Sequence, residues 1–410
     1  MKRVVITGLG AISPLGNNVL DTWENAKKGV CGIDEITQFD TSNHKIKLAA
    51  EVKDFDPTAY LGKSEVRKLD PFVQYAVISA KEAYSDAGFE DELLDKERMG
   101  VSVSSGIGGL YTIEETANKL RDAGPDRISP HFIPKVLTNL AAGNVAISLG
   151  AKGLCHTVVT ACAAGTDAIG CAYQHIQSGR LDVMIAGGAE ASITSLGIAG
   201  FSIIRAVSQS TDKNRASIPF DAQRNGFVMG EGAGMLVLES LEHATARGAK
   251  IYGEIVGYGA TCDAYHVTAP AEDGEGAIRA MKIALDDAKI APAEIDYINA
   301  HGTSTPLNDK TETKAVKSVF DDHSKKIAMS STKSMTGHML GAAGAIEAIF
   351  TVKSLQEDFI LPTINYQNVD PECDLDIVAN VGRKQELTYA MSNSLGFGGH
   401  NASLIFKKYE

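Results

Sequence analysis

The sequence contains no pair of cysteines spaced as CxxC, although it has six cysteines in all. That spacing is typical of zinc sites and of thiol–disulfide motifs, so neither is predicted. The HExxH pattern of helical zinc proteases is also absent. We therefore expect six free thiols in a reducing compartment, with no required metal and no cofactor.

Long apolar runs are missing too, because no stretch approaches the roughly 18 apolar residues of a membrane span. The apolar run near the N-terminus breaks early at glycines and a proline, so it predicts a first strand and not a signal peptide. Basic residues are in the minority, and the net charge of −12 argues against nonspecific binding to nucleic acid. We expect a cytoplasmic protein with no membrane or nucleic-acid partner.

What the chain does have is an alternation of β-rich apolar runs and helix-like segments over all 410 residues. Several apolar runs are continuous, which is typical of a sheet covered on both faces, and the pattern as a whole indicates an α/β fold. Expected strands include RVVITGLG, MGVSVSSG, HTVVTAC, DVMIAGGAE and GMLVLES, then IYGEIVGYG, IDYINAHG, KIAMSSTK, LDIVANV and ASLIFKK.

The two parts of the chain also echo each other. Ala163-Ala164-Gly165 and Ala342-Ala343-Gly344 each begin a helix of small residues, and GVSVSSGIGG resembles DYINAHGTST as a strand that enters a small-residue loop. We predict two pseudo-twofold halves, residues 1–250 and 251–410, because 410 residues exceed one ordinary core. The segments 21–66 and 111–145 are predicted insertions on the first half.

Cys162 lies in VVTACAAGTDAIG, between a predicted strand and a predicted helix that ends at Gly179. A thiol at a helix N-terminus gains thiolate character, and backbone N–H groups there can bind an oxyanion. On this stretch alone, a packed core thiol is the favoured interpretation, since free cysteines are among the most buried residues.

Three further clusters contain chemically useful side chains. His301 ends a predicted strand in NAHGTSTPLND, where Thr303 and Thr305 either bind a polar substrate arm or cap the next helix. Lys333 and His338 share one short loop in SSTKSMTGHMLGAAGA, where a solvated lysine is the ordinary alternative. A fourth cluster, SNSLGFGGHNASLIF, flanks an aromatic residue with glycines and predicts either a mobile aromatic or a plain turn.

Taken together and in this order, the four clusters resemble β-ketoacyl-acyl carrier protein synthases, most closely those of the synthase II type. The resemblance covers essentially the whole chain. It implies the thiolase fold, with two pseudo-duplicated halves in a five-layered αβαβα sandwich, and a homodimer. It implies an acyltransferase of fatty acid biosynthesis that elongates an acyl chain by two carbons.

The resemblance also implies roles for individual residues. Cys162 would carry the acyl group as a thioester, and the backbone N–H groups of Cys162 and Phe397 would bind the oxyanion. His301 and His338 would stabilise the enolate formed when malonyl-acyl carrier protein loses carbon dioxide. Lys333 would be a supporting charge with Glu347 as its partner. Phe397 would also act as a gate.

The binding surfaces follow from the same resemblance. The acyl pocket falls on Ile107 and Phe201, and the pantetheine contacts fall on Thr303 and Thr305. Acyl carrier protein is acidic, so a local basic surface is expected, for which KSEVRK and a downstream arginine supply candidates: Lys63, Arg67, Lys68 and Arg205. A solvated helix is the alternative for Lys63. Asp126 stands where the family often has a second base. No metal is required, but a monovalent cation would map to Asn299, Glu347 and Ser392.

Other functions compete with this hypothesis. A coenzyme A-dependent thiolase-like enzyme and a polyketide-type condensing enzyme are the nearest, but thiolases usually place a second cysteine near the C-terminus, where this chain has His400. A Cys–His hydrolase would not need Lys333 and His338 together. A non-catalytic chain-length-factor subunit typically lacks the nucleophile, and Cys162 argues against it.

Overall fold

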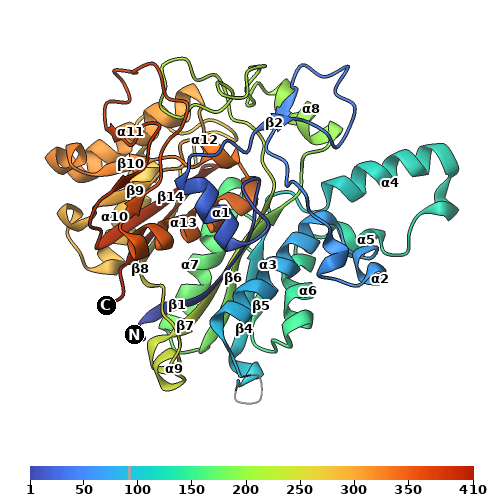
Figure 1. Ribbon diagram of the computed structural model, residues 1–410, viewed down its shortest axis with the longest axis horizontal. Coiled ribbons are helices and arrows are strands. Elements are labelled where there is room, and N and C mark those ends of the chain that lie inside the picture. Colours follow the sequence, from blue (N-terminus) through green and yellow to red (C-terminus); the bar gives the residue numbers. More distant parts are fainter. Residues whose placement is uncertain (91–93) are drawn as a thin grey trace.

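The computed structural model describes residues 1–90 and 94–410. Eleven of its strands form one sheet, which divides into two groups of the same design (Figure 1). In the first group the spatial order is β5-β4-β6-β7-β1, and in the second it is β12-β10-β9-β14-β15-β8. The first group consists of β1 (Val4–Ile12), β4 (Met99–Ser104), β5 (Cys155–His156), β6 (Val183–Glu190) and β7 (Gly232–Ser240). The second consists of β8 (Gly253–Cys262), β9 (Tyr297–Asn299), β10 (Ala328–Ser330), β12 (Asp376–Ile377), β14 (Tyr389–Gly396) and β15 (His400–Lys407).

Strand directions repeat as well. β4 is parallel to β5 and β6, while β7 is antiparallel to β6 and β1. β9 is likewise parallel to β10 and β14, while β15 is antiparallel to β14 and β8. Apart from the extra edge strand β12, the second group repeats the first strand by strand. This repeat supports the predicted halves, whose division at residue 250 stays a prediction and falls between α9 (Leu241–Ala246) and β8.

The helices form three layers around the two half-sheets. The outer layer of the first half consists of α3 (Pro71–Ala87), which packs on β1, β6 and β7, and α6 (Leu140–Leu149), which packs on β4. On the far side, α10 (Glu275–Ala288) covers β8 and β15, and α11 (Pro306–Phe320) lies against α10. Between the half-sheets, α7 (Ala164–Gln177) and α13 (Ala343–Glu357) pack on each other and on strands of both halves. The layers are therefore α, β, α, β, α, as expected.

The two half-sheets also touch directly, because β1 and β8 pair over the three residues Val4–Ile6. All nine residues of β1 are buried, which agrees with the prediction of a sheet covered on both faces. The largest apolar cluster combines residues of β1 and α7 with residues of α13 and β15, so one core spans both halves.

Most of the remaining elements lie in the predicted insertions. The segment 21–66 contains most of α1 (Val19–Lys27), then β2 (Asp34–Glu35), β3 (Leu48–Ala49) and α2 (Lys63–Val66). The segment 111–145 contains most of α4 (Leu110–Ala123), then α5 (Phe132–Val136) and part of α6. Outside these segments lie α8 (Ser195–Ile203), α12 (Lys333–Thr336) and a small pair, β11 (Phe359–Ile360) with β13 (Arg383–Lys384).

Several predicted strands are longer than the observed ones. HTVVTAC forms a strand only at its first residue, His156, which ends β5, because the chain must turn before Cys162 and residues 157–160 have no regular structure. LDIVANV likewise forms a strand only at Asp376–Ile377. β14 was not predicted as a strand of its own, because its sequence YAMSNSLG is rich in small polar residues that are here buried in the centre of a half-sheet. Among the described residues, no helix is long and apolar enough to cross a membrane.

Candidate active site

Cys162 lies in a single 3-10 turn, Ala161–Ala163, that leads directly into α7. Ala161 has a φ of 51°, a left-handed conformation that is costly for a residue with a side chain. The turn aims the cysteine away from the helix axis and into a cavity of about 400 Å³ that it shares with His301, His338 and Phe397. Cys162 therefore faces an open cavity as well as packing on the apolar cluster that contains Leu340.

The thiol of Cys162 is held between opposing influences. Burial raises its pKa to about 12, and the carboxylate of Glu190 adds to that rise. The charge of Lys333 and the backbone N–H groups of Phe397 and Cys162 act in the opposite direction, since they stabilise the thiolate. The two N–H groups that favour a negative sulfur are those expected to bind an oxyanion.

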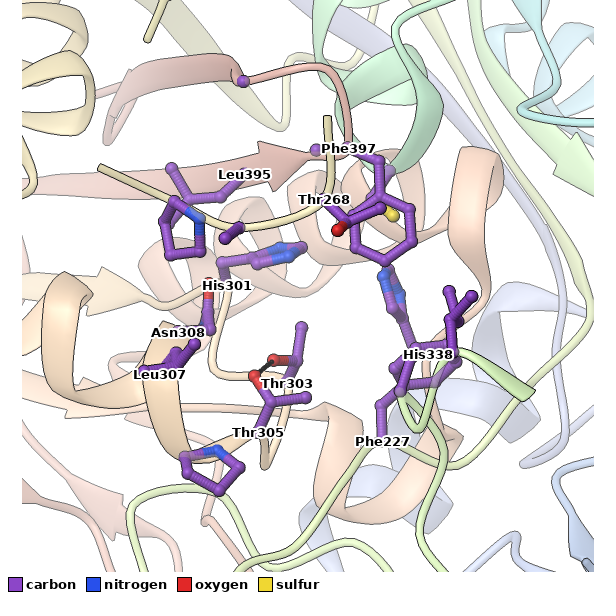
Figure 2. A pocket seen from close by; sticks show the side chains of 18 of the residues that line it. Phe227, Thr268, His301, Thr303, Thr305, Leu307, Asn308, His338, Leu395 and Phe397 are labelled. Carbon is purple, nitrogen blue, oxygen red and sulfur yellow. Dashed lines mark hydrogen bonds between the residues drawn. The ribbon is translucent and has the colours of Figure 1, made fainter. Parts of the chain in front are cut away.

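The two histidines meet at the cavity wall. His301 follows β9, and its backbone N–H and that of Gly302 donate to the buried Glu312 carboxylate, at 2.8 Å each. His338 lies between α12 and the 3-10 turn Leu340–Ala342. The two imidazole rings are 5.3 Å apart between centroids and nearly perpendicular (Figure 2). Strand β9 and the turn before α13 thus bring together two rings that are 37 residues apart in sequence.

Both imidazoles are buried, and burial together with the nearby charge of Lys333 holds the pKa of each well below its usual value. They are therefore neutral at physiological pH. The backbone N–H of Leu340 donates to Nδ1 of His338 at 3.3 Å, which leaves the proton of the neutral ring on Nε2. His338 can accordingly donate one hydrogen bond to a substrate atom.

Lys333 is the first residue of α12, and only 1% of its side chain is exposed. Its ammonium group forms an ion pair with Glu347 on α13, which is equally buried. The structure therefore rules out a solvated lysine at this position. A buried ion pair of this kind places one fixed positive charge beside the two neutral histidines.

Phe397 occupies the turn between β14 and β15, which pair from Gly396 and His400 onward. The turn has only three residues, and Gly398 and Gly399 have φ values of 88° and 74°, which glycine adopts without strain. The ring of Phe397 lies 6.5 Å from that of Phe201, which in turn contacts Phe227. The ring of Phe397 lies at the cavity wall (Figure 2), and its role as a gate stays a prediction.

Thr303 and Thr305 both line the cavity, and their hydroxyl groups are 2.9 Å apart. Thr305 is the N-cap residue of α11, but its side chain makes no capping hydrogen bond. The Thr305 hydroxyl therefore does not cap α11, and substrate binding by the two threonines stays a prediction. Phe201 lines the same cavity. Ile107 does not line it; it packs beside Cys162 in an adjoining apolar cluster that contains Leu340.

Three buried polar side chains, one of them a member of the ion pair, carry oxygens without a hydrogen-bond partner among the described residues. Ser392 lies directly across from Asn299 in the pairing of β14 with β9. The side-chain oxygens of Asn299 and Ser392, and one carboxylate oxygen of Glu347, have no hydrogen-bond partner in the described residues. Unpaired buried oxygens are costly unless a ligand satisfies them, and oxygen donors suit a monovalent cation. The residues predicted for such a site therefore fit it.

The predicted basic surface is divided. Lys63, Arg67 and Lys68 are all exposed on or just after α2 and do not line the cavity. Arg205 is exposed and lines the cavity after α8. Asp126 lies exposed in the segment after α4.

Several residues of the site were missed by sequence reasoning. Phe227 packs against His338, with ring centroids 5.2 Å apart, and Glu312 accepts a hydrogen bond from the backbone N–H of His301. The segment between β8 and α10 contributes Asp263 and Thr268 to the cavity. Phe227 offered a signal, because it stands in the glycine-rich RNGFVMGEG as Phe397 does in SLGFGGHN.

The family model for the β-ketoacyl synthase N-terminal domain matches residues 1–244, and that for the C-terminal domain matches residues 252–367. A 3-oxoacyl-[acyl-carrier-protein] synthase 2 of Staphylococcus aureus (strain COL) is 55% identical over 409 residues, covering 100% of this chain and 99% of the relative. Its counterpart from Synechocystis is 52% identical over 410 residues, with the same coverage.

Solved structures give the same result. The ishigamide ketosynthase/chain length factor matches with a TM-score of 0.94 and 38% identity, and a β-ketoacyl synthase from Burkholderia phymatum with 0.91 and 36%, each over the full length of both chains. The thiolase-like fold and the condensing-enzyme resemblance are thus confirmed. The chain belongs to the β-ketoacyl synthase family.

Proposed function

We propose that this chain is a 3-oxoacyl-acyl carrier protein synthase, which condenses malonyl-acyl carrier protein with an acyl group held on Cys162. The observation that carries the proposal is the convergence of Cys162, His301 and His338 on one cavity, where the backbone N–H groups of Cys162 and Phe397 favour the thiolate. The identity of 55% to the Staphylococcus aureus synthase over the full chain supports the same reaction.

In the first half-reaction the sulfur of Cys162 attacks the thioester carbonyl of an acyl-carrier substrate. The N–H groups of Cys162 and Phe397 bind the oxyanion of the tetrahedral intermediate. The carbon–sulfur bond to the carrier then breaks, and the proton that Cys162 loses ends on the departing carrier thiol. The dipole of α7 and the charge of Lys333 favour the thiolate against the effect of burial.

In the second half-reaction malonyl-acyl carrier protein enters by the same cavity. The thioester oxygen accepts hydrogen bonds from His301 and His338, so that it can hold the negative charge when the carbon–carboxylate bond breaks and carbon dioxide leaves. The resulting carbanion attacks the acyl thioester on Cys162 and expels the thiolate. The product is a 3-oxoacyl thioester two carbons longer than the primer.

Lys333 supports this chemistry without lining the cavity. Its charge keeps both imidazoles neutral, and its ion pair with Glu347 fixes its position. A monovalent cation held by Asn299, Glu347 and Ser392 would supply a fixed charge that orders these groups. The pantetheine arm passes Thr303 and Thr305, and the acyl chain extends past Phe201 toward Ile107. Since Ile107 lies outside the open cavity, its side chain must move to admit a long chain.

The partners follow from the surface. Acyl carrier protein docks on the basic residues of α2 and on Arg205 at the cavity mouth. A second copy of the chain pairs with β5, which ends the first half-sheet with one edge free and is flanked by the exposed apolar Val159 and Ile147. The dimer operates in the cytoplasm, with each chain built from the halves 1–250 and 251–410.

The test is a condensation assay with acyl- and malonyl-acyl carrier protein, read by mass spectrometry of the carrier. The proposal predicts a 3-oxoacyl product two carbons longer than the primer. A product extended by several units would instead assign a polyketide-type condensing enzyme, and transfer from coenzyme A alone would assign a thiolase-like one.

A further inference from the structure

Glu190 is the last residue of β6, and it is fully buried beside the active site. Its carboxylate accepts four hydrogen bonds. One oxygen accepts from the hydroxyls of Ser105 and Ser192, at 2.9 and 3.0 Å. The other accepts from the backbone N–H groups of Gly106 and Gly341, at 2.8 and 3.1 Å. No role described so far uses this carboxylate.

The hydrogen bond from Gly341 lies in a turn that repeats the turn around Cys162. The turn Ala161–Ala163 leads into α7, and the turn Leu340–Ala342 leads into α13. The first residue of each turn is left-handed, with a φ of 51° at Ala161 and 48° at Leu340. Gly341 therefore occupies the position in the second half that Cys162 occupies in the first.

No side chain can stand at that second position. A Cβ atom on Gly341 would lie 2.2 Å from the backbone nitrogen of Gly106 and 3.0 Å from the Glu190 carboxylate. The amide of Gly341 corresponds to the Cys162 amide that faces the reacting sulfur. In the second half this amide bonds to Glu190 instead of facing a substrate.

The second turn carries part of the active site. Its residue Leu340 donates its N–H to Nδ1 of His338, and that bond sets the tautomer of the ring. Gly106 immediately precedes Ile107, beside the acyl pocket. One buried carboxylate thus joins a loop of the first half to the turn of the second half that orients His338.

We propose that Glu190 is a positioning residue for the decarboxylation half-reaction: by binding the amides of Gly341 and Gly106 together, it holds the turn that orients His338. This inference rests on the proposed function. Glu190 acts here because its side chain is long enough to accept hydrogen bonds from both amides. The charge of Glu190 has a separate effect, because it disfavours the thiolate of Cys162.

Two substitutions separate the effect of side-chain length from the effect of charge. Glu190→Gln keeps an oxygen in place for both amides but removes the charge, whereas Glu190→Asp keeps the charge but is one methylene too short to bind both amides. The matched control is Glu239→Asp, a fully buried carboxylate of the adjacent strand β7 that pairs with Val183, at the opposite end of β6 from Glu190.

Two readouts are measured on the folded dimer. The first is decarboxylation of malonyl-acyl carrier protein without primer, and the second is the pH midpoint at which iodoacetamide alkylates Cys162. We expect Glu190→Asp to slow decarboxylation about 100-fold, the effect of a misplaced catalytic group, with the alkylation midpoint unchanged. We expect Glu190→Gln to stay within about tenfold of the wild-type rate, because only the serine hydrogen bonds change, and to move the midpoint to lower pH.

The proposal is overturned if Glu190→Asp decarboxylates at the wild-type rate, or if it is slowed no more than Glu239→Asp. If Glu190→Asp does not fold, Glu190→Gln decides, and a rate more than about tenfold below wild type overturns the proposal. Wild-type protein that neither decarboxylates the malonyl substrate nor takes up an acyl group contradicts the proposed function instead.

Discussion

At the residue scale, burial and a nearby charge fix the protonation states of the two histidines in the site. Burial and Lys333 hold the pKa of His301 and His338 well below the usual value, so both rings are neutral hydrogen-bond donors. A neutral donor suits an enolate oxygen that must later release its charge to the attacking carbon. The neutral state of both rings is therefore part of the proposed mechanism.

This arrangement predicts the pH dependence of decarboxylation. A lowered pKa means that each ring takes up its proton only at more acidic pH than a free imidazole, whose pKa is about 6.5. We expect the decarboxylation rate to show no inflection near that pH. Rates measured on malonyl-acyl carrier protein across the range test this, and an inflection near 6.5 that vanishes in His338→Gln would contradict it.

The Lys333–Glu347 pair gives a second prediction at this scale. Lys333→Met leaves a carboxylate buried without its partner, so we expect a loss of about 3–5 kcal/mol in the free energy of unfolding. The double variant Lys333→Met with Glu347→Leu removes both charges and should recover most of that loss, while condensation stays impaired.

Denaturant unfolding and condensation rates measure the two effects. If the double variant recovered activity along with stability, the positive charge would have no role in the reaction.

At the scale of elements, the site is assembled where turns meet: the turn before α7, the turn before α13 and the hairpin of β14 and β15. Hydrogen bonds and close contacts fix these turns against one another. A Cβ atom on Gly396 would lie 2.7 Å from the carbonyl oxygen of Thr160 and 3.3 Å from the nitrogen of Cys162. The hairpin therefore approaches the nucleophile as closely as a backbone without side chain permits.

We expect Gly396→Ala to push the amide of Phe397 away from the sulfur and to slow acyl transfer about 100-fold, the usual effect of losing one oxyanion donor. Gly200→Ala, on α8 with open space around it, is the matched control. Single-turnover acylation of Cys162 measures the effect. Equal rates for the two variants would show that the hairpin amide does not bind the oxyanion.

The elements also show what the sequence could and could not predict. Continuous apolar runs predicted β1, β6 and β7, because strands covered on both faces need apolar residues at every position. β14 was missed because it contains small polar residues, such as Ser392 and Ser394, where a buried strand would have an apolar run. These residues are buried beside the site and beside the contact between α7 and α13. The four clusters located Cys162, His301, Lys333 and His338, but Glu190 and Glu312 act through contacts with other segments of the chain, which no local pattern indicates.

At the scale of the whole molecule, the surface charge and the free sheet edge at β5 decide which partners can bind. The net charge of −12 repels an acidic carrier at long range, so binding must rely on local basic residues. Exposed Arg67 and Lys68 lie on the first half, near α2.

We expect Arg67→Glu and Lys68→Glu each to raise the KM for carrier-linked substrates about tenfold and to leave acylation by a short pantetheine thioester unchanged. Lys282→Glu, an exposed lysine on α10 in the far outer layer, makes the same change in net charge and serves as the control. Steady-state kinetics with both substrates distinguish local docking from an effect of overall charge. An equal rise in KM for all three variants would contradict docking at α2.

The central claim is that Cys162 carries the acyl group, and the most direct measurement is the intact mass of the protein after incubation with acyl-acyl carrier protein, followed by peptide mapping. The wild-type chain should gain one acyl group on the peptide that contains Cys162. Cys162→Ala should fold normally, since losing one sulfur atom from the cavity wall costs about 1 kcal/mol or less, and should gain none. An acyl group on another residue, or one that persists in Cys162→Ala, would contradict the account.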